Sequence, residues 1–472
     1  MASLSPKQTA CLAALAAHFP PATCLVGDDV PVRNEADTSF LPPTRPIALV
    51  RPDTPEGVAA AMRICSTHGV AVVPQGGLTG LAGGAHPIEG AVALSVERLS
   101  GIEEIDAASA TMTVKAGTPL EVIQLAAQEA GFFVPLDLGA RGSCLIGGNL
   151  GTNAGGNRVI RYGMAREMVL GLEYVLADGT LVTSLNKMIK NNAGYDLKQL
   201  FIGSEGTLGI ITRAVLRLQP RPGCTLAALC GVSSYEHVVS LLGAARRGLG
   251  PLLSAFEVMW PDYWKEATET VKGIRKPIAG EHAFYVLLEA QGLQEDVDGP
   301  RFMEWLEAQF EAGLIEDAAI SQSMADVTMF WRTRDAAGEF QTVLGPHVAF
   351  DIGLPVVRMD EFAVVCRARL ADALPGMLSV YYGHIGDGNI HIVALQRGAV
   401  PQPSAEIARI VYDTVREFGG TVSAEHGIGT VKKPYLSYTR TAEEMALMAL
   451  LKKALDPQGI LNPGKVFDLP ST

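Results

Sequence analysis

The first half of the chain alternates short apolar runs with stretches whose apolar residues recur at helical spacing. Residues 47–50 and 70–74 are predicted to be buried strands, and residues 58–68 between them a helix. Thr54 precedes this helix as a typical N-cap, and Gly69 follows it as a typical helix end. Strands and helices therefore alternate, and the pattern indicates a domain of mixed α and β structure.

Further strands are predicted at residues 112–117, 171–182 and 208–220. The middle one is interrupted by Asp178-Gly179, a residue pair typical of a tight hairpin turn. The glycine-rich texture ends at residues 219–223, Gln-Pro-Arg-Pro-Gly, which we take as the main domain boundary.

Beyond this boundary the helical stretches are longer, and all four tryptophans lie there. Strands and helices alternate again, which predicts a second α+β domain that acts as a cap. The predicted domains are residues 1–220, residues 221–430 and a C-terminal segment of residues 431–472, in which a helix precedes a coil. The predicted helices of the second domain are residues 235–248, 298–314 and 358–374, and its predicted strands are residues 282–290 and 347–356.

Composition excludes some classes of function. The formal charge of −12 argues against a nucleic-acid partner, because binding to polyphosphate relies on Lys and Arg. No apolar run reaches the ~18 residues of a membrane span. The seven scattered cysteines contain no CxxC pair and are expected to be buried thiols of a reducing compartment. Residues 1–20 are expected to form an amphipathic helix, with a signal peptide as the weaker alternative, so a cytoplasmic protein is expected.

Glycine is concentrated in three stretches, residues 74–84, 142–156 and 203–211. None contains GxGxxG, and the chain has no P-loop motif, so the usual nucleotide fingerprints are absent from the sequence. Glycines at this density let backbone N–H groups approach a diphosphate, but they also serve in plain tight turns. From the glycines alone, both interpretations stay open.

Two histidines flank a short loop in GHIGDGNIHI, residues 383–392. If the loop has four residues, His384 lies directly opposite His391, and cross-strand partners share one face of a sheet with Cβ atoms roughly 5 Å apart. Two imidazoles at that distance can hold one cation, and Glu425 is the candidate for a third ligand of a zinc-type site. A hydrogen-bonded histidine pair without metal is the alternative.

The glycine stretches carry a resemblance to a known family. Residues 74–85 (PQGGLTGLAGGA) resemble the pyrophosphate loop of the vanillyl-alcohol-oxidase/p-cresol-methylhydroxylase (PCMH) flavoproteins, and residues 134–156 and 191–212 resemble their other flavin-contacting stretches. More narrowly, the motifs between about residues 45 and 467 resemble the D-2-hydroxyglutarate dehydrogenase branch of the FAD-dependent D-2-hydroxyacid dehydrogenases.

The resemblance implies an α+β fold with a PCMH-type FAD-binding domain, a cap domain that carries a metal site, and a C-terminal segment that returns to the FAD. The cofactor-binding residues that it implies are Pro74, Gly76, Gly77, Thr79, Gly80, Leu81, Ser143, Gly147, Gly148, Thr152, Ala154, Gly155, Gly209, Ile210 and Asn462. Some members of the superfamily bond FAD covalently through a histidine. Thr79 stands at the matching position here and has no ring nitrogen, so non-covalent FAD is expected.

The resemblance also implies roles in the reaction. His384, His391 and Glu425 match the family's ligands of a divalent metal, for which Zn²⁺ is expected, and His426 matches the catalytic base that also contacts the substrate. A plain strand would send Glu425 and His426 to opposite faces, and Gly427 is expected to bend the chain so that both face the site.

The substrate implied is a D-2-hydroxy acid, most specifically D-2-hydroxyglutarate. Arg332 matches the arginine that pairs with a substrate carboxylate, and Arg334 is its rival. Where the family's hydroxyglutarate enzymes have Thr, Lys and Asn, this chain has Ala336, Ala349 and Val393, so D-lactate or a longer apolar D-2-hydroxy acid stays open.

Three other readings stay open from the sequence: an oxidase that passes electrons to O₂, a colourless metal-dependent hydrolase with merely structural glycine loops, and a non-catalytic binding module. For a dehydrogenase, an electron-transfer flavoprotein or a quinone is the expected electron acceptor. Whether the protein is a homodimer is left open.

Overall fold

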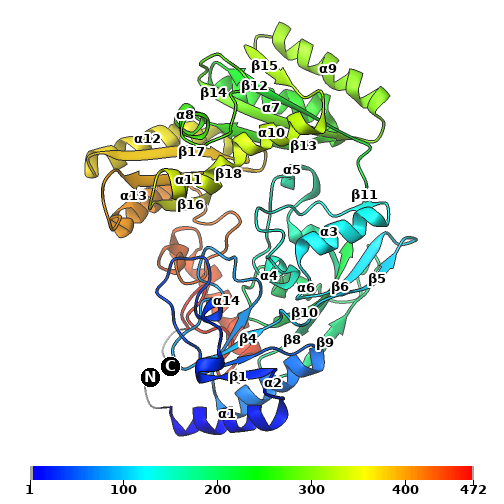
Figure 1. The fold of residues 1–472 in the computed structure, drawn as a ribbon, viewed down its shortest axis with the longest axis vertical. Helices are drawn as coiled ribbons and strands as arrows, with labels where there is room; N and C mark the ends of the chain where they lie inside the picture. Colours follow the sequence, from blue (N-terminus) through cyan, green and yellow to red (C-terminus); the bar gives the residue numbers. More distant parts are fainter. Residues whose placement is uncertain (1–3, 470–472) are drawn as a thin grey trace. The chain divides into compact units, whose positions relative to one another are not determined.

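The computed structural model describes residues 4–469, and its chain divides into two compact units (Figure 1). The first unit comprises Met1–Gly156, Gly163–Pro220 and Glu425–Thr472, and the second comprises Asn157–Tyr162 and Arg221–Ala424. The chain therefore passes to the second unit twice, at residues 157–162 and at residues 221–424.

Two main sheets form the first unit. One has the strand order β1-β2-β4-β3, and in it β4 pairs in parallel with both β2 and β3. The other is antiparallel, with the order β5-β6-β10-β8-β9. The strands are β1 Cys24–Val26, β2 Ala48–Val50, β3 Val72–Gln75, β4 Val92–Ser95, β5 Ile102–Asp106, β6 Thr111–Lys115, β7 Phe132–Phe133, β8 Val169–Val175, β9 Leu181–Ser184, β10 Ile210–Arg217 and β11 Gln219–Pro220. The helices are α1 Pro6–His18, α2 Pro55–His68, α3 Leu120–Glu129, α4 Ile146–Gly151, α6 Lys198–Phe201 and α14 Ala442–Leu455.

Local sequence signals set the element ends of this unit as predicted. Thr54 accepts a hydrogen bond from the backbone N–H of Gly57 (3.1 Å) and so caps α2. Gly69 ends the helix with a φ of 62°, a left-handed conformation that glycine adopts without a steric penalty. The hairpin β8–β9 turns at Asp178, whose carboxylate accepts from the N–H of Thr180 (2.8 Å).

One antiparallel seven-stranded sheet, in the order β15-β12-β14-β13-β17-β18-β16, forms the second unit. Its strands are β12 Cys224–Val232, β13 Leu253–Met259, β14 Phe284–Gly292, β15 Asp317–Ile320, β16 Val348–Gly353, β17 Met377–Gly383 and β18 Asn389–Gln396. Its helices are α5 Val159–Tyr162, α7 Tyr235–Gly248, α8 Pro261–Glu269, α9 Glu295–Glu311, α10 Met324–Arg334, α11 Phe340–Val343, α12 Met359–Ala373 and α13 Ser404–Glu417. An apolar core that includes Tyr263, Phe330 and Phe340 joins α8, α10 and α11 to the sheet.

Helix α7 has the predicted bounds, whereas α9 begins at residue 295, three residues before the predicted start. The reason is local. The carboxylate of Asp298 accepts from the N–H groups of Leu293 (2.8 Å) and Gln294 (3.1 Å), which satisfies donors at the start of the helix. The mixed helix and sheet architecture agrees with the predicted α+β fold class.

The predicted register of the histidine hairpin is wrong by two residues. His391 pairs with Tyr382, whereas His384 lies beyond the end of β17 and caps a short 3-10 turn, Ile385–Asp387. Gly388, with a φ of 92°, closes that turn, so the loop is longer than the predicted four residues. The rings of the two histidines nevertheless lie close together, with centroids 5.2 Å apart.

Two further predictions concern cysteines and membranes. Among the described residues no helix is long and apolar enough to cross a membrane. The seven cysteines are all buried with free thiols, as their scattered positions predict.

Candidate flavin cleft and histidine pair

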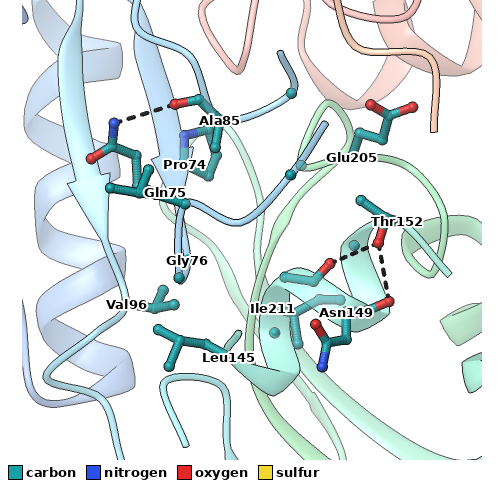
Figure 2. Close-up of a pocket in the computed structure, with 18 of the residues that line it drawn as sticks. Pro74, Gln75, Gly76, Ala85, Val96, Leu145, Asn149, Thr152, Glu205 and Ile211 are labelled. Carbon is teal, nitrogen blue, oxygen red and sulfur yellow. Dashed lines mark hydrogen bonds between the residues drawn. The ribbon is translucent and has the colours of Figure 1, made fainter. Parts of the chain in front are cut away.

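A cleft with an empty volume of about 940 Å³, including solvent at its mouth, lies within the first unit (Figure 2). All three glycine-rich stretches contribute to its wall, together with one residue of the C-terminal return, His426. The glycine stretches therefore meet around one site.

Two glycines show why the wall needs residues without a side chain. A Cβ atom on Gly77 would lie 2.2 Å from the carbonyl oxygen of Ser143, and one on Gly147 would lie 2.7 Å from the Cβ of Ala116. Both distances are far below van der Waals contact, so larger residues would push the stretches apart. The close approach of these glycine stretches brings their backbone groups into the lining of the cleft.

Most of the cofactor-binding residues expected from the resemblance line this cleft. The ten that do are Pro74, Gly76, Gly77, Thr79, Gly80, Gly147, Gly148, Thr152, Gly209 and Ile210. Five described residues of the expected set lie outside the lining: Leu81, Ser143, Ala154, Gly155 and Asn462. Asn462 supports the lining instead, because its amide donates to the carbonyls of two lining residues, Gly84 (3.0 Å) and Glu205 (2.7 Å).

Glu205 also lines the cleft, although its place in the GSEG sequence did not single it out (Figure 2). Its carboxylate accepts from the backbone N–H groups of Ile428 (2.7 Å) and Gly429 (2.8 Å). Burial raises the pKa of this carboxyl despite those bonds. Glu205 therefore fastens the C-terminal return to the wall of the cleft.

The residues around His426 are not part of a strand. Gly427 has a φ of 78°, a conformation that favours glycine, so the chain bends directly after His426 as predicted. His426 lines the cleft, whereas the carboxylate of Glu425 accepts from the backbone N–H of Gly156 (2.9 Å). The backbone of Gly156 therefore holds the Glu425 carboxylate, while His426 reaches the cleft.

In the second unit the rings of His384 and His391 lie close together, with centroids 5.2 Å apart and nearly perpendicular planes. His384 is 4% exposed, and its Nδ1 lies 2.6 Å from the carboxylate of Glu257. Burial raises the pKa of Glu257, but the charges of His384 and Arg334 outweigh burial and leave that pKa below its usual range. A carboxylate on one ring nitrogen is the arrangement that orients metal-binding histidines.

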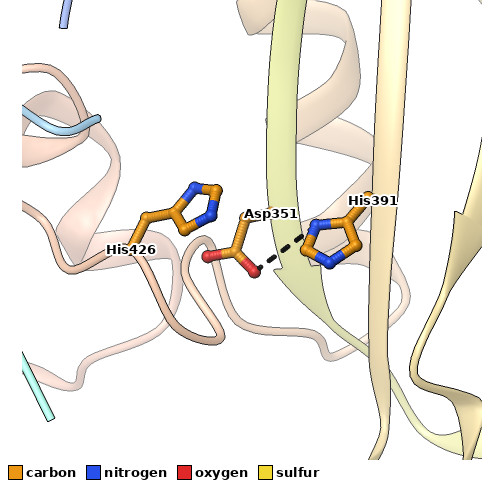
Figure 3. A group of neighbouring side chains, drawn as sticks. All are labelled: Asp351, His391 and His426. Atoms are coloured by element: carbon orange, nitrogen blue, oxygen red, sulfur yellow. Dashed lines mark ion pairs between the residues drawn. The ribbon is translucent and has the colours of Figure 1, made fainter. Parts of the chain in front are cut away.

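A second carboxylate accompanies His391. The fully buried Asp351 lies 4.0 Å from the Nδ1 of His391, an ion pair drawn in Figure 3. Asp351 also accepts from the amide of Asn389 (2.8 Å) and from the backbone N–H of Ala424 (3.2 Å). Ala424 is the residue before Glu425, so Asp351 holds the chain immediately before the third expected ligand.

The two candidate arginines have different surroundings. The Nη2 of Arg332 donates to the carbonyl of Lys272 (3.3 Å) at the surface. Arg334 is 7% exposed, donates from Nε to Glu257 (2.7 Å), and has its Nη2 3.0 Å from the Nε2 of His384. Arg334, rather than Arg332, therefore places its guanidinium beside the histidine pair.

The three positions at which this chain departs from the family's polar residues differ in burial. Ala336 and Val393 are 2% and 3% exposed and belong to the apolar core of the second unit. Ala349 pairs with Val393 across β16 and β18 and is exposed. The pair Ala349 and Val393, which lies two residues along β18 from His391, is therefore apolar.

Two family models match the chain: the FAD binding domain over residues 46–184 and the C-terminal domain of the FAD linked oxidases over residues 222–466. The chain is 41% identical over 430 residues to D-2-hydroxyglutarate dehydrogenase of Xanthomonas citri pv. viticola, covering 90% of this chain and 89% of that protein. It is 39% identical over 419 residues to the mitochondrial D-2-hydroxyglutarate dehydrogenase of Bos taurus, covering 89% and 76%. A mitochondrial Schizosaccharomyces pombe protein provisionally named D-lactate dehydrogenase is 36% identical over 425 residues, covering 88% and 81%.

Solved structures agree with the fold. Substrate-bound p-cresol methylhydroxylase superposes with a TM-score of 0.79 at 17% identity and covers 100% of this chain and 99% of its own. The 4-ethylphenol oxidase of Gulosibacter chungangensis gives a TM-score of 0.76 at 18% identity over the same shares. The fold is therefore of the PCMH type, as the glycine motifs predicted.

Proposed function

Since the chain belongs to the FAD-linked oxidase family and is an FAD-dependent dehydrogenase, we propose that it oxidises a D-2-hydroxy acid to the 2-oxo acid. D-2-hydroxyglutarate is the first substrate to test, because the relatives at about 40% identity carry that name. The observation that carries the proposal is the position of His426 in the wall of the glycine-lined cleft. A proton acceptor there can serve a substrate next to the flavin.

FAD fits the cleft because glycines of all three stretches line it, and backbone N–H groups of glycines can approach a diphosphate closely. When bound, FAD supplies the acceptor for the hydride that leaves the substrate Cα. The glycine stretches hold the cofactor, and His426 takes the proton of the substrate hydroxyl. Neutral imidazole performs that role, so catalysis requires His426 to be deprotonated.

A divalent metal, with Zn²⁺ as the first choice, is proposed to be held by His384, His391 and Glu425. Support comes from the closeness of the two rings and from Glu257, which is placed to fix the tautomer of His384. The set of two imidazoles and one carboxylate is typical of catalytic zinc sites. When bound, the metal supplies a Lewis acid that lowers the pKa of the substrate hydroxyl.

Arg334 is proposed to pair with a substrate carboxylate in place of Arg332. Its guanidinium already lies beside His384, whereas that of Arg332 contacts a backbone carbonyl at the surface. Glu257 and Asp335 hold Arg334 from two sides, at 2.7 and 3.2 Å, so the side chain is fixed before substrate arrives.

D-lactate or a longer apolar D-2-hydroxy acid is the second candidate substrate. It is favoured by the apolar residues Ala336 and Val393, which offer nothing to a second carboxylate. An electron-transfer flavoprotein or a quinone is proposed as the electron acceptor.

The test is an anaerobic screen in which reduction of the bound flavin is followed by its absorbance near 450 nm, roughly the flavin maximum, with matched pairs of D- and L-2-hydroxy acids. Rapid bleaching by D-2-hydroxyglutarate, and none by its L-enantiomer, is expected. Bleaching by no D-2-hydroxy acid would refute the proposal, and a protein without flavin absorbance would favour a hydrolase. Comparing turnover with O₂ and with an artificial dye separates an oxidase from a dehydrogenase.

A further inference from the structure

A short segment, Asn157–Tyr162, belongs to the second unit although the chain on both sides of it belongs to the first. We call it the strap; it contains α5 and follows the glycine-rich stretch that ends at Gly156. Gly156 (φ 117°) and Gly163 (φ 74°) flank the strap, and both have backbone conformations that residues with a side chain rarely adopt. The chain can therefore change direction sharply at each end of the strap.

Arg158 fastens the strap to the second unit. Its Nε and Nη2 donate to the two carboxylate oxygens of Glu289, at 2.8 and 3.2 Å. Glu289 lies on β14 and is fully buried. A two-point contact between a guanidinium and a carboxylate fixes direction as well as distance, so the strap has a defined orientation on the sheet.

Glu289 holds two more elements through the same carboxylate. The hydroxyl of Ser254 on β13 donates to Oε1 (2.8 Å), and the indole N–H of Trp331 on α10 donates to Oε2 (2.8 Å). Helix α10 ends at Arg334, whose guanidinium lies beside His384. Replacing Glu289 therefore removes contacts of both the strap and the helix that carries Arg334.

The strap also contacts the loop between the two expected histidine ligands. Ile160 packs on Gly386, in the loop between the two histidines, so closely that a Cβ atom on Gly386 would lie 2.6 Å from the Ile160 Cδ1. Gly156, the residue directly before the strap, donates its N–H to the carboxylate of Glu425 (2.9 Å) within the first unit. The strap itself thus contacts the histidine loop, and its preceding residue contacts Glu425.

We propose that Arg158 and Glu289 are positioning residues of this enzyme. Their ion pair fixes the strap, which packs on the loop between the two histidines and follows directly on Gly156, the residue that holds the carboxylate of Glu425. Neither residue contacts substrate in this account, which rests on the proposed function. Residues that orient the ligands of a metal commonly change metal affinity or activity by about 10–100-fold when they are replaced.

The test compares Glu289→Gln with a matched control, Glu173→Gln. Glu173 is also fully buried on a strand and accepts a two-point contact from Arg213 (2.8 and 2.5 Å) and bonds from Thr212 and Thr183, both at 2.8 Å. Both substitutions remove the charge of a buried carboxylate that faces an arginine, so both should lower the melting temperature. The control lies in the first unit, whereas the strap belongs to the second.

Three quantities are measured on the FAD-loaded proteins: the flavin content, the Zn²⁺ dissociation constant by competition with a chelator, and kcat and KM with the best D-2-hydroxy acid. We expect Glu289→Gln to keep its flavin, to raise the Zn²⁺ dissociation constant about 10–100-fold, and to lower kcat/KM by a similar factor. Glu173→Gln should match the wild type in all three. A Glu289→Gln protein that differs from wild type only in melting temperature would overturn the proposal.

Arg158→Lys guards against a Glu289 variant that fails to fold. Lysine keeps the charge but has no fork, so the Zn²⁺ dissociation constant should rise by roughly 3–10-fold, less than with Glu289→Gln. The double variant Arg158→Met/Glu289→Gln should lose no more affinity than the more severe single variant, because both remove one interaction. Fully additive losses would show that the two residues act separately and would contradict the proposal.

The outcomes separate this proposal from the function on which it rests. A wild-type protein that binds no divalent metal and whose flavin is reduced by no D-2-hydroxy acid would overturn both. If the wild type binds the metal and its flavin is reduced by a D-2-hydroxy acid, and Glu289→Gln performs equally well in both assays, only the positioning role would be overturned.

Discussion

Arg332 and Arg334 lie two positions apart on α10, yet they have different surroundings. The two arginines are separated by about 200° around α10, because successive helical residues are about 100° apart. Both suit a carboxylate, so the sequence pattern admits either one. In the folded protein Arg334 lies beside Glu257 and His384, whereas Arg332 contacts a backbone carbonyl at the surface.

Arg334→Gln should therefore damage substrate binding far more than Arg332→Gln. A hydrogen bond to a charged group is worth about 1.5–3 kcal/mol, so kcat/KM should fall by roughly 10–100-fold for Arg334→Gln and by less than about twofold for Arg332→Gln. Steady-state kinetics with the same D-2-hydroxy acid check this. Equal losses in the two variants would contradict the assignment.

His426→Ala should keep its FAD and its metal, because His426 belongs to neither proposed set of ligands. Turnover should fall by about 10²–10⁴, the usual contribution of a positioned proton acceptor. The kcat/KM of the wild type should rise with pH through one ionisation, since only the neutral imidazole accepts a proton, and the variant should lack that rise. Loss of metal in step with activity would instead make His426 a ligand.

At the scale of elements, the faces of strands were predictable but the loop between them was not. The sequence predicted that the two histidines lie close together on one face. Their rings do lie close together, although the predicted register was wrong by two residues. The error arose because the short turn Ile385–Asp387 closes through the left-handed Gly388, a choice that local sequence does not dictate. Charged residues inside apolar strand patterns, such as Glu257 and Asp351, were the signal that the sequence analysis missed.

Glu257 joins the end of β13 to His384 and Arg334, and its removal should be costly. Leaving a buried cation without its partner commonly costs about 3–5 kcal/mol, so Glu257→Gln should lower the free energy of unfolding by that order. Urea unfolding of metal-free protein at neutral pH measures it. A loss below about 1 kcal/mol would show that solvent or another group replaces the carboxylate.

The carboxylate of Glu257 should also make the free energy of unfolding depend on pH. Because the folded protein lowers the pKa of Glu257, its stabilising contribution is present above the ordinary carboxyl value of about 4.3 and is lost as the pH falls through the lower folded value. The free energy of unfolding of the wild type should therefore decline more steeply below about pH 4 than that of Glu257→Gln. If the free energy of unfolding declines equally in the two proteins, other carboxylates cause the loss of stability at low pH.

At the scale of the whole molecule, the fold class and the meeting of the three glycine stretches were accessible from sequence, since several motifs occur in a fixed order. The change of unit at residues 157–162 was not, because a short stretch within one glycine-rich region gives no sign that it packs on another sheet. The role of Asn462 was only partly accessible. Its position near the cofactor site was expected, but its bonds to the carbonyls of two lining residues, Gly84 and Glu205, depend on the folded backbone.

The flavin should leave the protein without cleavage of any bond to it. Thr79 lines the cleft and has no ring nitrogen with which to form a covalent link. Precipitating the protein with acid should therefore leave all the yellow colour in the supernatant and none in the pellet. Colour retained in the washed pellet would show a covalent flavin attached through another residue.

The return of the chain at residue 425 has a consequence for biosynthesis. Val72 bonds to Ile460 and Asn462 through its backbone, and the amide of Asn462 reaches Gly84, 378 positions earlier. At about 5–20 residues per second, the ribosome needs roughly 20–80 seconds between making these two parts. During that interval the second unit can fold, but the cleft still lacks part of its support. A nascent chain should therefore acquire FAD late, and chains stalled in the second unit should stay empty and open to proteases.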